Sequence, residues 1–466
     1  MTIWRPDLSR SSGPKYQAIA DAIGEAVAQG TLSPGDRLPP HRQLAWDLGV
    51  TVGTVSRAYA LAEQRQLVAG TVGRGTFVCG GNVSAAAAGP LLSLSPVDNG
   101  VIDLSVNATL LDSTAAAFAE TLADVMSTAD PATLLTYSRA NGLPEHRAAA
   151  ARWFNVTGLT VDADAVVLTA GAQLGLAAAM DVVAQPTRHV FVERLTYPVL
   201  KRIAANRGVR LTGVALDDEG MRPEALDAAA RAAPEVRAVF LVPTLQNPTA
   251  TTMSAERRAA IAAVARARDL VIVEDDVYGY VALDRPPPLA TWAPERTVYL
   301  SSASKCTAPG LRVGWFAAPS GLRERLTDAV YAATLTQPVL THEVVRRWIE
   351  DGTAARLVAE MRDELAARHA MAREIFSHLT YPDDPTSPHI LLPLPAGWRS
   401  DDFVASVLAR GFRLASVEAF AVGPEPVAPA VRLSLGAVRD RSVLAAALAA
   451  IRDTLDGRST ADRMVI

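Results

Sequence analysis

The chain has 466 residues, of which 49% are hydrophobic and 20% charged, with a formal net charge of −4 at pH 7. This length allows two or three domains around a large core, and no apolar run is long enough to span a bilayer. Because there is no signal-peptide core and there are only two cysteines, the sequence excludes a disulfide scaffold and predicts a soluble cytoplasmic protein without a metal site.

The first part of the chain has the pattern of a small helical domain. Apolar residues recur at helical spacing over 16–27. Residues 42–50 predict a short helix closed by Gly49, and Thr51 would cap a second helix over 52–66. Two short helices joined in this way predict a helix-turn-helix, whose second helix enters the major groove of DNA.

A hairpin is expected next, over residues 67–78, with a glycine-rich tip that carries Arg74. Such a hairpin would form a wing against the DNA backbone or the minor groove. Residues 1–80 carry eight basic and six acidic side chains, a net charge of +2 against −6 for the remainder. The sign suits a domain that faces DNA, although the difference is small.

The segment resembles the GntR-type winged helix-turn-helix in the order of its motifs, which are Leu38-Pro39-x-x-Arg42-x-Leu44-Ala45, Leu48-Gly49-Val50, Thr54-Val55 and Gly73-x-Gly75-Thr76-Phe77-Val78. The resemblance implies a set of DNA contacts: Arg42, Thr51, Thr54, Ser56, Arg57 and Arg74. The sequence departs from the family at Val52, where many members have a polar or basic residue, so the base preference stays open. A three-helix cap with surface arginines is the plainer alternative.

The chain then changes character twice. Residues 81–102 lack periodicity and predict a flexible linker between a DNA-binding domain at 1–80 and a second domain at 103–466. In that second domain, strand-like runs alternate with helices rich in alanine and arginine, which is typical of a doubly wound α/β fold. From about residue 341 the pattern shifts to helices and short strands, which indicates a smaller α+β part.

Lysine is rare in this sequence. It occurs only at positions 15, 201 and 305, against 42 arginines (45 basic residues minus 3). Lys305 follows the apolar run 297–300, a predicted buried strand, and open α/β sheets bind ligands past the carboxyl ends of their strands. An amine, unlike a guanidinium, can form a Schiff base with an aldehyde. A solvated surface lysine is the alternative, and a serine acylase is excluded because the sequence lacks Lys-Thr-Gly.

Residues upstream of Lys305 supply what a pyridine cofactor with a phosphate group requires. Such a cofactor needs a carboxylate at its ring nitrogen, and hydroxyls, amides and a cation at its phosphate. The apolar strand at 270–273 ends in carboxylates, and the strand at 239–242 ends in a polar turn. Residues 170–175 lie between a strand and a helix, whose first amides would face an anion.

These motifs, Asn247-Pro-Thr, Asp275-x-x-Tyr278, Ser302-x-Ser304-Lys305 and Pro309-Gly-Leu-Arg312, resemble those of the fold-type I aminotransferases that use pyridoxal 5'-phosphate. The resemblance implies that Lys305 is the catalytic lysine that binds the cofactor as a Schiff base, and that Asp275 meets the ring nitrogen. It implies further contacts with the ring, its hydroxyl and the phosphate from Asn247, Tyr278, Tyr197, Ala172, Gln173, Ser302, Ser304 and Arg312.

Two further residues enter through the same resemblance. Tyr137 matches the tyrosine that reaches the phosphate bound by the neighbouring subunit of a homodimer. Arg432, in the predicted strand 431–435, matches the arginine that binds a substrate α-carboxylate, for which guanidinium geometry is suited. An ordinary surface ion pair is the alternative for a single arginine.

A GntR-like head joined to an aminotransferase-like body resembles the MocR/GabR group of transcription regulators. The resemblance implies a homodimer that binds a double-stranded DNA operator and responds to a small-molecule amine or amino acid through the cofactor on Lys305. Two other hypotheses stay open: an active aminotransferase with an accessory DNA-binding head, and a regulator whose effector is the cofactor itself, as a report of vitamin B6 status. The effector, the operator, the regulated genes and the sign of regulation do not follow from the sequence.

Overall fold

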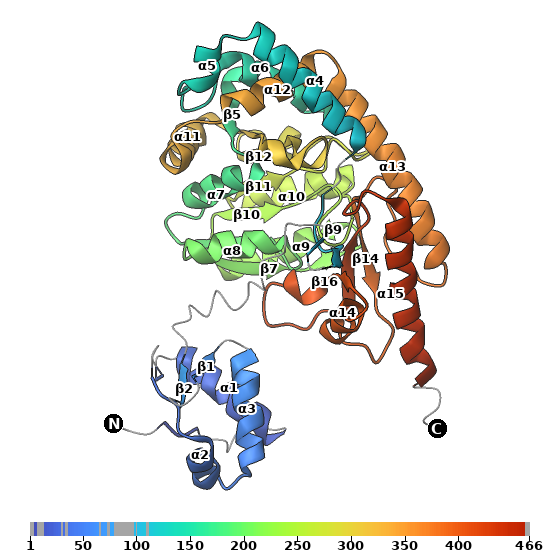
Figure 1. Cartoon of the computed structure of the whole chain (residues 1–466). Helices are drawn as coiled ribbons and strands as arrows, with labels where there is room; N and C mark the ends of the chain where they lie inside the picture. The colour runs from blue at the N-terminus through green and yellow to red at the C-terminus, as the bar shows by residue number, and fades with distance from the viewer. Residues whose placement is uncertain are drawn as a thin grey trace. The chain divides into compact units, whose positions relative to one another are not determined.

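The computed structural model of the chain describes residues 4–6, 14–28, 31–32, 36–64, 67–71, 75–78, 97–98, 100–108 and 111–461. The chain divides into two compact units, Met1–Pro90 and Leu91–Ile466, which we call the head and the body (Figure 1). No helix in the described part of the chain is long and apolar enough to cross a membrane.

The head is a helix-turn-helix followed by a hairpin, as the sequence predicts. Its elements are α1 (Lys15–Ala28), α2 (His41–Leu48), α3 (Val52–Gln64), β1 (Val68–Thr71) and β2 (Gly75–Val78), and the two strands pair antiparallel. Gly49 ends α2 with a φ of 62°, a conformation that glycine adopts without strain. Thr51 precedes α3, and its Oγ1 accepts a hydrogen bond from the Thr54 amide at 3.1 Å. Ile19, Ile23 and Val55 are fully buried in the small core that holds these helices together.

The body is built on one central sheet of seven strands within the described residues. Its order is β5 (Val166–Thr169), β13 (Gly314–Ala317), β12 (Thr297–Ser302), β11 (Val271–Asp275), β10 (Ala238–Leu241), β6 (His189–Glu193) and β7 (Arg210–Val214). All neighbouring pairs are parallel except those made by β13, which runs antiparallel to both β12 and β5. The sheet is therefore doubly wound, as predicted. The reversed direction of β13 does not follow from the alternation of strands and helices in the sequence.

Both faces of this sheet are covered, which explains why most positions in its central strands are apolar and buried. Val192, Phe240 and Phe316 face one layer of helices, α7 (Ala172–Val183), α8 (Pro198–Asn206) and α11 (Ser320–Thr334). Phe191 and Ile272 face the opposite layer, which includes α9 (Pro223–Ala232) and α10 (Ala255–Ala267). Additional helices extend this body: α4 (Asp112–Thr128), α5 (Pro131–Leu135), α6 (Pro144–Val156), α12 (Val339–Glu350) and α13 (Thr353–Ile375), the last running along its side (Figure 1).

The smaller part of the body has its own core, which includes Phe376, Ile390, Phe403 and Leu433. Its elements are β14 (His389–Pro393), α14 (Ser400–Leu408), β15 (Phe412–Arg413), β16 (Ala415–Ser416), β17 (Ala430–Ser434) and α15 (Arg441–Ala461). This agrees with the change of pattern near residue 341, since α13 leads directly into it.

The end of the predicted linker takes part in this smaller core. Its residues form β3 (Val97–Asp98) and β4 (Val101–Asp103), and β4 pairs in parallel with β15. The side chain of Leu104 is buried in the core, and its carbonyl accepts a hydrogen bond from the Ser434 amide at 2.8 Å. Residues 81–96 and 99 of the predicted linker lie outside the described residues.

Candidate functional site

Four chain segments bring the predicted cofactor residues to one edge of the central sheet. Lys305 ends a short 3-10 turn directly after β12, and Asp275 is the last residue of β11. Asn247 lies in the turn after β10, and α7 begins three residues after β5. These strands are mutually parallel, so their carboxyl ends meet at this edge, where the sequence motifs predict a ligand.

Lys305 is the centre of this edge. Its Nζ donates a hydrogen bond to the backbone carbonyl of Asn107. Burial, together with the positive charge of Arg432, lowers the pKa of the Lys305 amine to about 8, and the negative charge of Asp275 opposes both effects. A substantial fraction of the amine is therefore neutral near physiological pH, which is the form that attacks an aldehyde.

Asp275 and Asp276 are adjacent in sequence but have different partners. Asp276 forms an ion pair with Arg285 at 2.8 Å and accepts a hydrogen bond from Tyr299 at 2.6 Å. Asp275 is 7% exposed and accepts only a long hydrogen bond, 3.3 Å, from the Val277 amide among the described contacts. Burial raises the pKa of Asp275 to about 7. Its carboxyl group is thus poised to share a proton with a basic ring nitrogen.

A cradle of the kind that binds phosphate lies beside Lys305. Ala172 and Gln173 begin α7, and the Arg312 guanidinium reaches the Ala170 carbonyl at 3.5 Å. A Cβ atom added to Gly171, which has a φ of 85°, would lie 2.4 Å from Nη2 of Arg312. The positive φ of this turn therefore favours glycine, and any added side chain would also displace the guanidinium.

Two serines line the same turn. The hydroxyl of Ser302 accepts a hydrogen bond from the Ser304 amide at 3.3 Å, while Ser304 Oγ is buried without a partner among the described residues. A buried hydroxyl of this kind is costly unless a ligand or water satisfies it. Free amides, hydroxyls and a guanidinium are the groups that a phosphate requires, so these residues fit one.

The aromatic and amide side chains predicted for the cofactor ring lie close by. Tyr197 accepts a hydrogen bond from Gln173 at 3.1 Å, and Tyr278 accepts one from Asn107 at 3.0 Å. Asn247 Oδ1 is buried without a partner among the described residues. A ring that carries a hydroxyl group would satisfy this orphaned oxygen, so the donor set fits a pyridoxal group as well as its phosphate.

Arg432, on β17 of the smaller part, reaches the same site. Its side chain is 2% exposed and donates hydrogen bonds to Asn107 Oδ1 and to the Ser105 carbonyl. The guanidinium also lies 5.4 Å from the centre of the Phe420 ring, within the range of a cation–π contact. Burial lowers the pKa of Arg432 to about 10, which still leaves it charged at neutral pH.

Tyr137 is not gathered with these residues. It is 76% exposed after α5 and lines a different cavity, with Asp130, Thr133 and Leu143.

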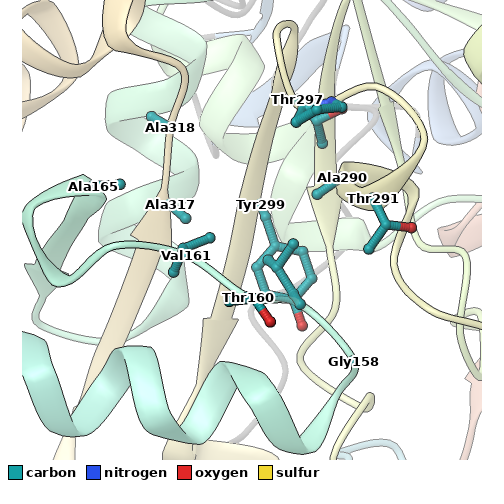
Figure 2. Close-up of a pocket in the computed structure, with 12 residues that line it drawn as sticks. Gly158, Thr160, Val161, Ala165, Ala290, Thr291, Thr297, Tyr299, Ala317 and Ala318 are labelled. Carbon is teal, nitrogen blue, oxygen red and sulfur yellow. The ribbon is translucent and has the colours of Figure 1, made fainter.

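A larger cavity of about 380 Å³ lies at the opposite edge of the sheet (Figure 2). It is formed by Thr297 at the start of β12, by Tyr299, and by small side chains such as Ala290 and Ala317. The lining residues include no charged side chain, so this cavity lacks the groups that a phosphate requires.

Two residues that the motifs did not identify join the site. Asn107 contacts Lys305, Tyr278, Arg432 and His389, and the Nε2 of His389 donates to the Gln246 carbonyl at 3.0 Å. The signal available in the sequence was the run from Asp103 to Asn107, in which polar residues alternate with Leu104 and Val106. Such a run is common at strand ends, and only the fold shows that it meets Lys305.

The predicted DNA contacts that fall within the described residues are all at least partly exposed on the head. Arg42, Thr51 and Arg57 are exposed, while Thr54 and Ser56 are half-buried and hydrogen-bonded to Thr51 and His41 respectively, both at 2.9 Å. Val52 is 44% exposed at the start of α3, so the departure from the family pattern lies on the surface. Arg74 lies outside the described residues.

Both parts of the chain match known families. Residues 99–451 match the class I and II aminotransferases, and residues 15–78 match the gntR family of bacterial regulatory proteins. The HTH-type transcriptional regulator YdeF of Bacillus subtilis is 28% identical over 97% of each chain. The HTH-type pyridoxine biosynthesis transcriptional regulator PdxR of Corynebacterium glutamicum is 30% identical over 78% of each chain.

This chain belongs to the MocR-type transcriptional regulators. The predicted family, fold class and cofactor are thereby confirmed: a MocR-type regulator has a GntR-type DNA-binding head and a body that depends on pyridoxal 5'-phosphate. Solved structures agree on the fold of the body. Kynurenine aminotransferase of Pyrococcus horikoshii is 24% identical, with a TM-score of 0.71 over 79% of this chain and 93% of that one. An archaeal alanine:glyoxylate aminotransferase is 21% identical, with a TM-score of 0.71 over 77% and 91%.

Proposed function

We propose that this MocR-type regulator holds pyridoxal 5'-phosphate on Lys305 and uses it to sense a small amine or amino acid, whose binding alters the affinity of the head for its operator. The observation that carries the proposal is the meeting of two groups in one buried network. Lys305, a primary amine with a lowered pKa, and Arg432, a buried guanidinium, both bond to Asn107. An amine site and an anion site therefore lie side by side.

Each part of the cofactor has a proposed partner. Asp275 would hold the ring nitrogen, Asn247 and Tyr278 the ring hydroxyl, and Tyr197 the face of the ring. The phosphate would be met by Ala172, Gln173, Ser302, Ser304 and Arg312. When bound, pyridoxal phosphate supplies an aldehyde that condenses with primary amines and a ring that withdraws electrons.

Lys305 would have two tasks in this scheme. Its neutral amine attaches the cofactor, and once an incoming amine has taken its place, Lys305 Nζ is free to hold a proton. Arg432 would grip a carboxylate on the incoming molecule through parallel hydrogen bonds. Because the protein keeps both Lys305 and Arg432, it would be able to convert an amino donor slowly and still act as a regulator.

We propose further that the protein is a homodimer. The exposed Tyr137 would reach the phosphate bound by the partner subunit, as its 76% exposure permits. Leu135, at the end of α5, is 86% exposed nearby in sequence. Large exposed apolar side chains of this kind favour an interface between subunits.

The head would read double-stranded DNA in the cytoplasm through α3 and the surface around it. Arg42 and Arg57 would meet phosphates, and Thr51, Thr54 and Ser56 would lie at the major-groove end of the recognition helix. Arg74 would extend the contact through the tip of the hairpin. Each phosphate contact releases a counterion, so replacement of Arg42 by alanine should lower the salt dependence of binding by about one unit of slope.

A second candidate function has support from one relative. The name of PdxR ties that protein to pyridoxine biosynthesis, which favours a version in which pyridoxal phosphate itself is the effector. In that version, DNA binding responds to cofactor loading and is indifferent to every amino acid.

A single titration tests these alternatives. Fluorescence anisotropy of a labelled duplex taken from the DNA upstream of this protein's own gene would be measured with apoprotein, with loaded protein, and with loaded protein plus a panel of amino acids. Selective binding that shifts with an amino acid supports the sensor. A shift on loading alone supports the second candidate. No selective binding in any arm contradicts both, and a sustained keto-acid product would then identify an enzyme.

A further inference from the structure

The segment that leads out of the predicted linker ends inside the cofactor site. β4 ends at Asp103, which is buried, forms an ion pair with Arg413 at 3.0 Å and accepts a hydrogen bond from the Ser105 amide at 2.8 Å. Asn107 follows four residues after Asp103. We call residues 103–107 the strap.

The side chain of Asn107 is fully used by its neighbours. Its amide nitrogen donates to Tyr278 OH at 3.0 Å and to Nδ1 of His389 at 2.8 Å, while its Oδ1 accepts from Arg432. His389 is held neutral, because its Nε2–H donates to a backbone carbonyl and burial lowers the pKa of the ring to about 3. With both amide hydrogens committed, only Oδ1 can face Arg432.

Arg432 is satisfied only by neutral oxygens. Asn107 Oδ1 and the Ser105 carbonyl accept its hydrogen bonds, and its Nε has no partner among the described residues. None of the ion pairs seen between described residues involves Arg432. Asp103 acts on Arg432 electrostatically without bonding to it, so the guanidinium has no direct ion pair and would gain from a carboxylate bonded to it, since charge-assisted hydrogen bonds are stronger than neutral ones.

We propose that Asn107 is a specificity-determining residue that occupies the carboxylate site of Arg432, so that only a ligand bearing both an amine and a carboxylate displaces the strap. This deepens the proposed function and rests on it. A simple amine would take the place of Lys305 on the cofactor, release the free lysine amine, and leave Arg432 bonded to Asn107 and Ser105. An amino acid places its carboxylate on Arg432 and must break both bonds.

Displacement of the strap would also change contacts outside the carboxylate site of Arg432. Asn107 also bonds to Lys305 and Tyr278, so its release frees two cofactor contacts at once. In the other direction along the chain, the strap continues into β4, which is paired with β15 and preceded by the linker. The ligand would shift this segment only through its different affinity for the docked and released states. The strap is thus joined through β4 and β3 to the segment that leads towards the head along the sequence.

The test compares three small probes on the full-length, cofactor-loaded protein. L-alanine carries both groups, ethylamine lacks the carboxylate, and propionate lacks the amine. Dissociation constants for L-alanine and ethylamine would be taken from the absorbance of the bound cofactor, and that for propionate from competition with L-alanine. Amide hydrogen exchange of a peptide covering residues 100–108 would report on the strap.

Asn107→Asp should place a carboxylate on Arg432 and weaken the binding of L-alanine about tenfold relative to that of ethylamine. Asn107→Ala removes the competing oxygen and should shift the ratio of the two dissociation constants several-fold in favour of L-alanine. Both variants also lose contacts to Tyr278 and His389, but that loss affects the binding of both amines equally. The ratio of the two dissociation constants therefore reports only on the competition between residue 107 and the ligand carboxylate for Arg432. Ser105→Ala is the matched control, because Ser105 meets Arg432 through its backbone carbonyl. In the wild type, exchange at 100–108 should rise with L-alanine and not with ethylamine.

Equal changes for both amines in the Asn107 variants would give Asn107 a purely structural role and overturn the inference. So would a wild-type protein that binds L-alanine no more tightly than ethylamine, since Arg432 would then not receive a carboxylate. Failure of the proposed function itself looks different. In that case borohydride reduction leaves no cofactor on Lys305 of the wild type, whatever the Asn107 variants do.

Discussion

The head and the body present their functional groups in opposite ways. In the body, Asp275 and Arg432 are buried, and each is oriented by neighbours that are themselves fixed. In the head, Arg42 and Arg57 are exposed, and the surface around them is ordered by contacts such as the hydrogen bond between Thr51 and Thr54. A cofactor needs donors fixed to within a fraction of an ångström, whereas DNA phosphates are met by long side chains that adapt. We therefore expect single changes to act steeply in the body and gradually in the head.

The steepest expected effect is at Lys305. Lys305→Ala should remove covalent attachment of the cofactor completely, because no other lysine follows β12 and an alanine cannot form the bond. Borohydride reduction followed by mass spectrometry would show no label at this position. The head should still bind duplex DNA non-specifically with the wild-type salt dependence. A wild-type absorbance spectrum in the variant would contradict the assignment.

The next largest effect is expected from replacement of Gly171 at the phosphate cradle. Gly171→Ala would place a methyl group 2.4 Å from Arg312 Nη2 in a backbone conformation that alanine adopts with strain. We expect the dissociation constant of the cofactor to rise at least about tenfold, measured by equilibrium dialysis. Gly310→Ala is the matched control, since nothing lies within 4 Å of the added atom. Equal losses in both variants would argue against a tight cradle.

A smaller, graded effect concerns pH. The neutral amine of Lys305 is the reactive form, so the rate of cofactor loading should rise with pH and level off above a midpoint near pH 8, where an ordinary lysine would continue to about 10.5. Arg432→Gln removes a positive charge that lowers this pKa, and the midpoint should move upwards. Absorbance during loading of apoprotein across pH 6 to 10 measures both curves. Coincident midpoints would show that Lys305 does not sense Arg432.

The smallest effect is expected in the head. Thr51→Ala removes the cap of α3 and should cost about 1 kcal/mol, which corresponds to a roughly fivefold loss of amide protection in that helix. Cofactor affinity should not change. Hydrogen exchange of the full-length protein measures both units in one experiment, and a loss of protection in the central sheet would contradict the separation of head and body.

Much of this architecture follows from local sequence patterns. Gly49 and Thr51 mark the helix-turn-helix because only a few residue types are favoured at the ends of helices. The apolar runs before Asp275 and Lys305 predict strands whose carboxyl ends lie at one edge of the sheet. The positions of Asn107 and His389 could not be predicted in this way. Their contacts join segments 282 residues apart, and an asparagine after a short strand is usually a turn residue.

The reversed direction of β13 and the inclusion of residues 97–103 in the body also escaped the sequence patterns. Strand direction depends on the path of the connecting turn, here the 3-10 turns that carry Lys305 and Arg312. The pairing of β4 with β15 joins residues roughly 310 positions apart, as the hydrogen bond between Arg413 and Asp103 illustrates. Neither is encoded by hydrophobic periodicity, which reports burial rather than partners.

The pairing of β4 with β15 also sets the order in which the protein is completed during synthesis. The head is made of contiguous residues up to Val78, so it is finished early and its contacts are local. The core that buries Leu104 is closed by residues of α15, such as Leu448 and Ile451, close to the other end of the chain. A ribosome therefore exposes a finished DNA-binding module long before the site that regulates it can close, and β4 must wait for its partner strand.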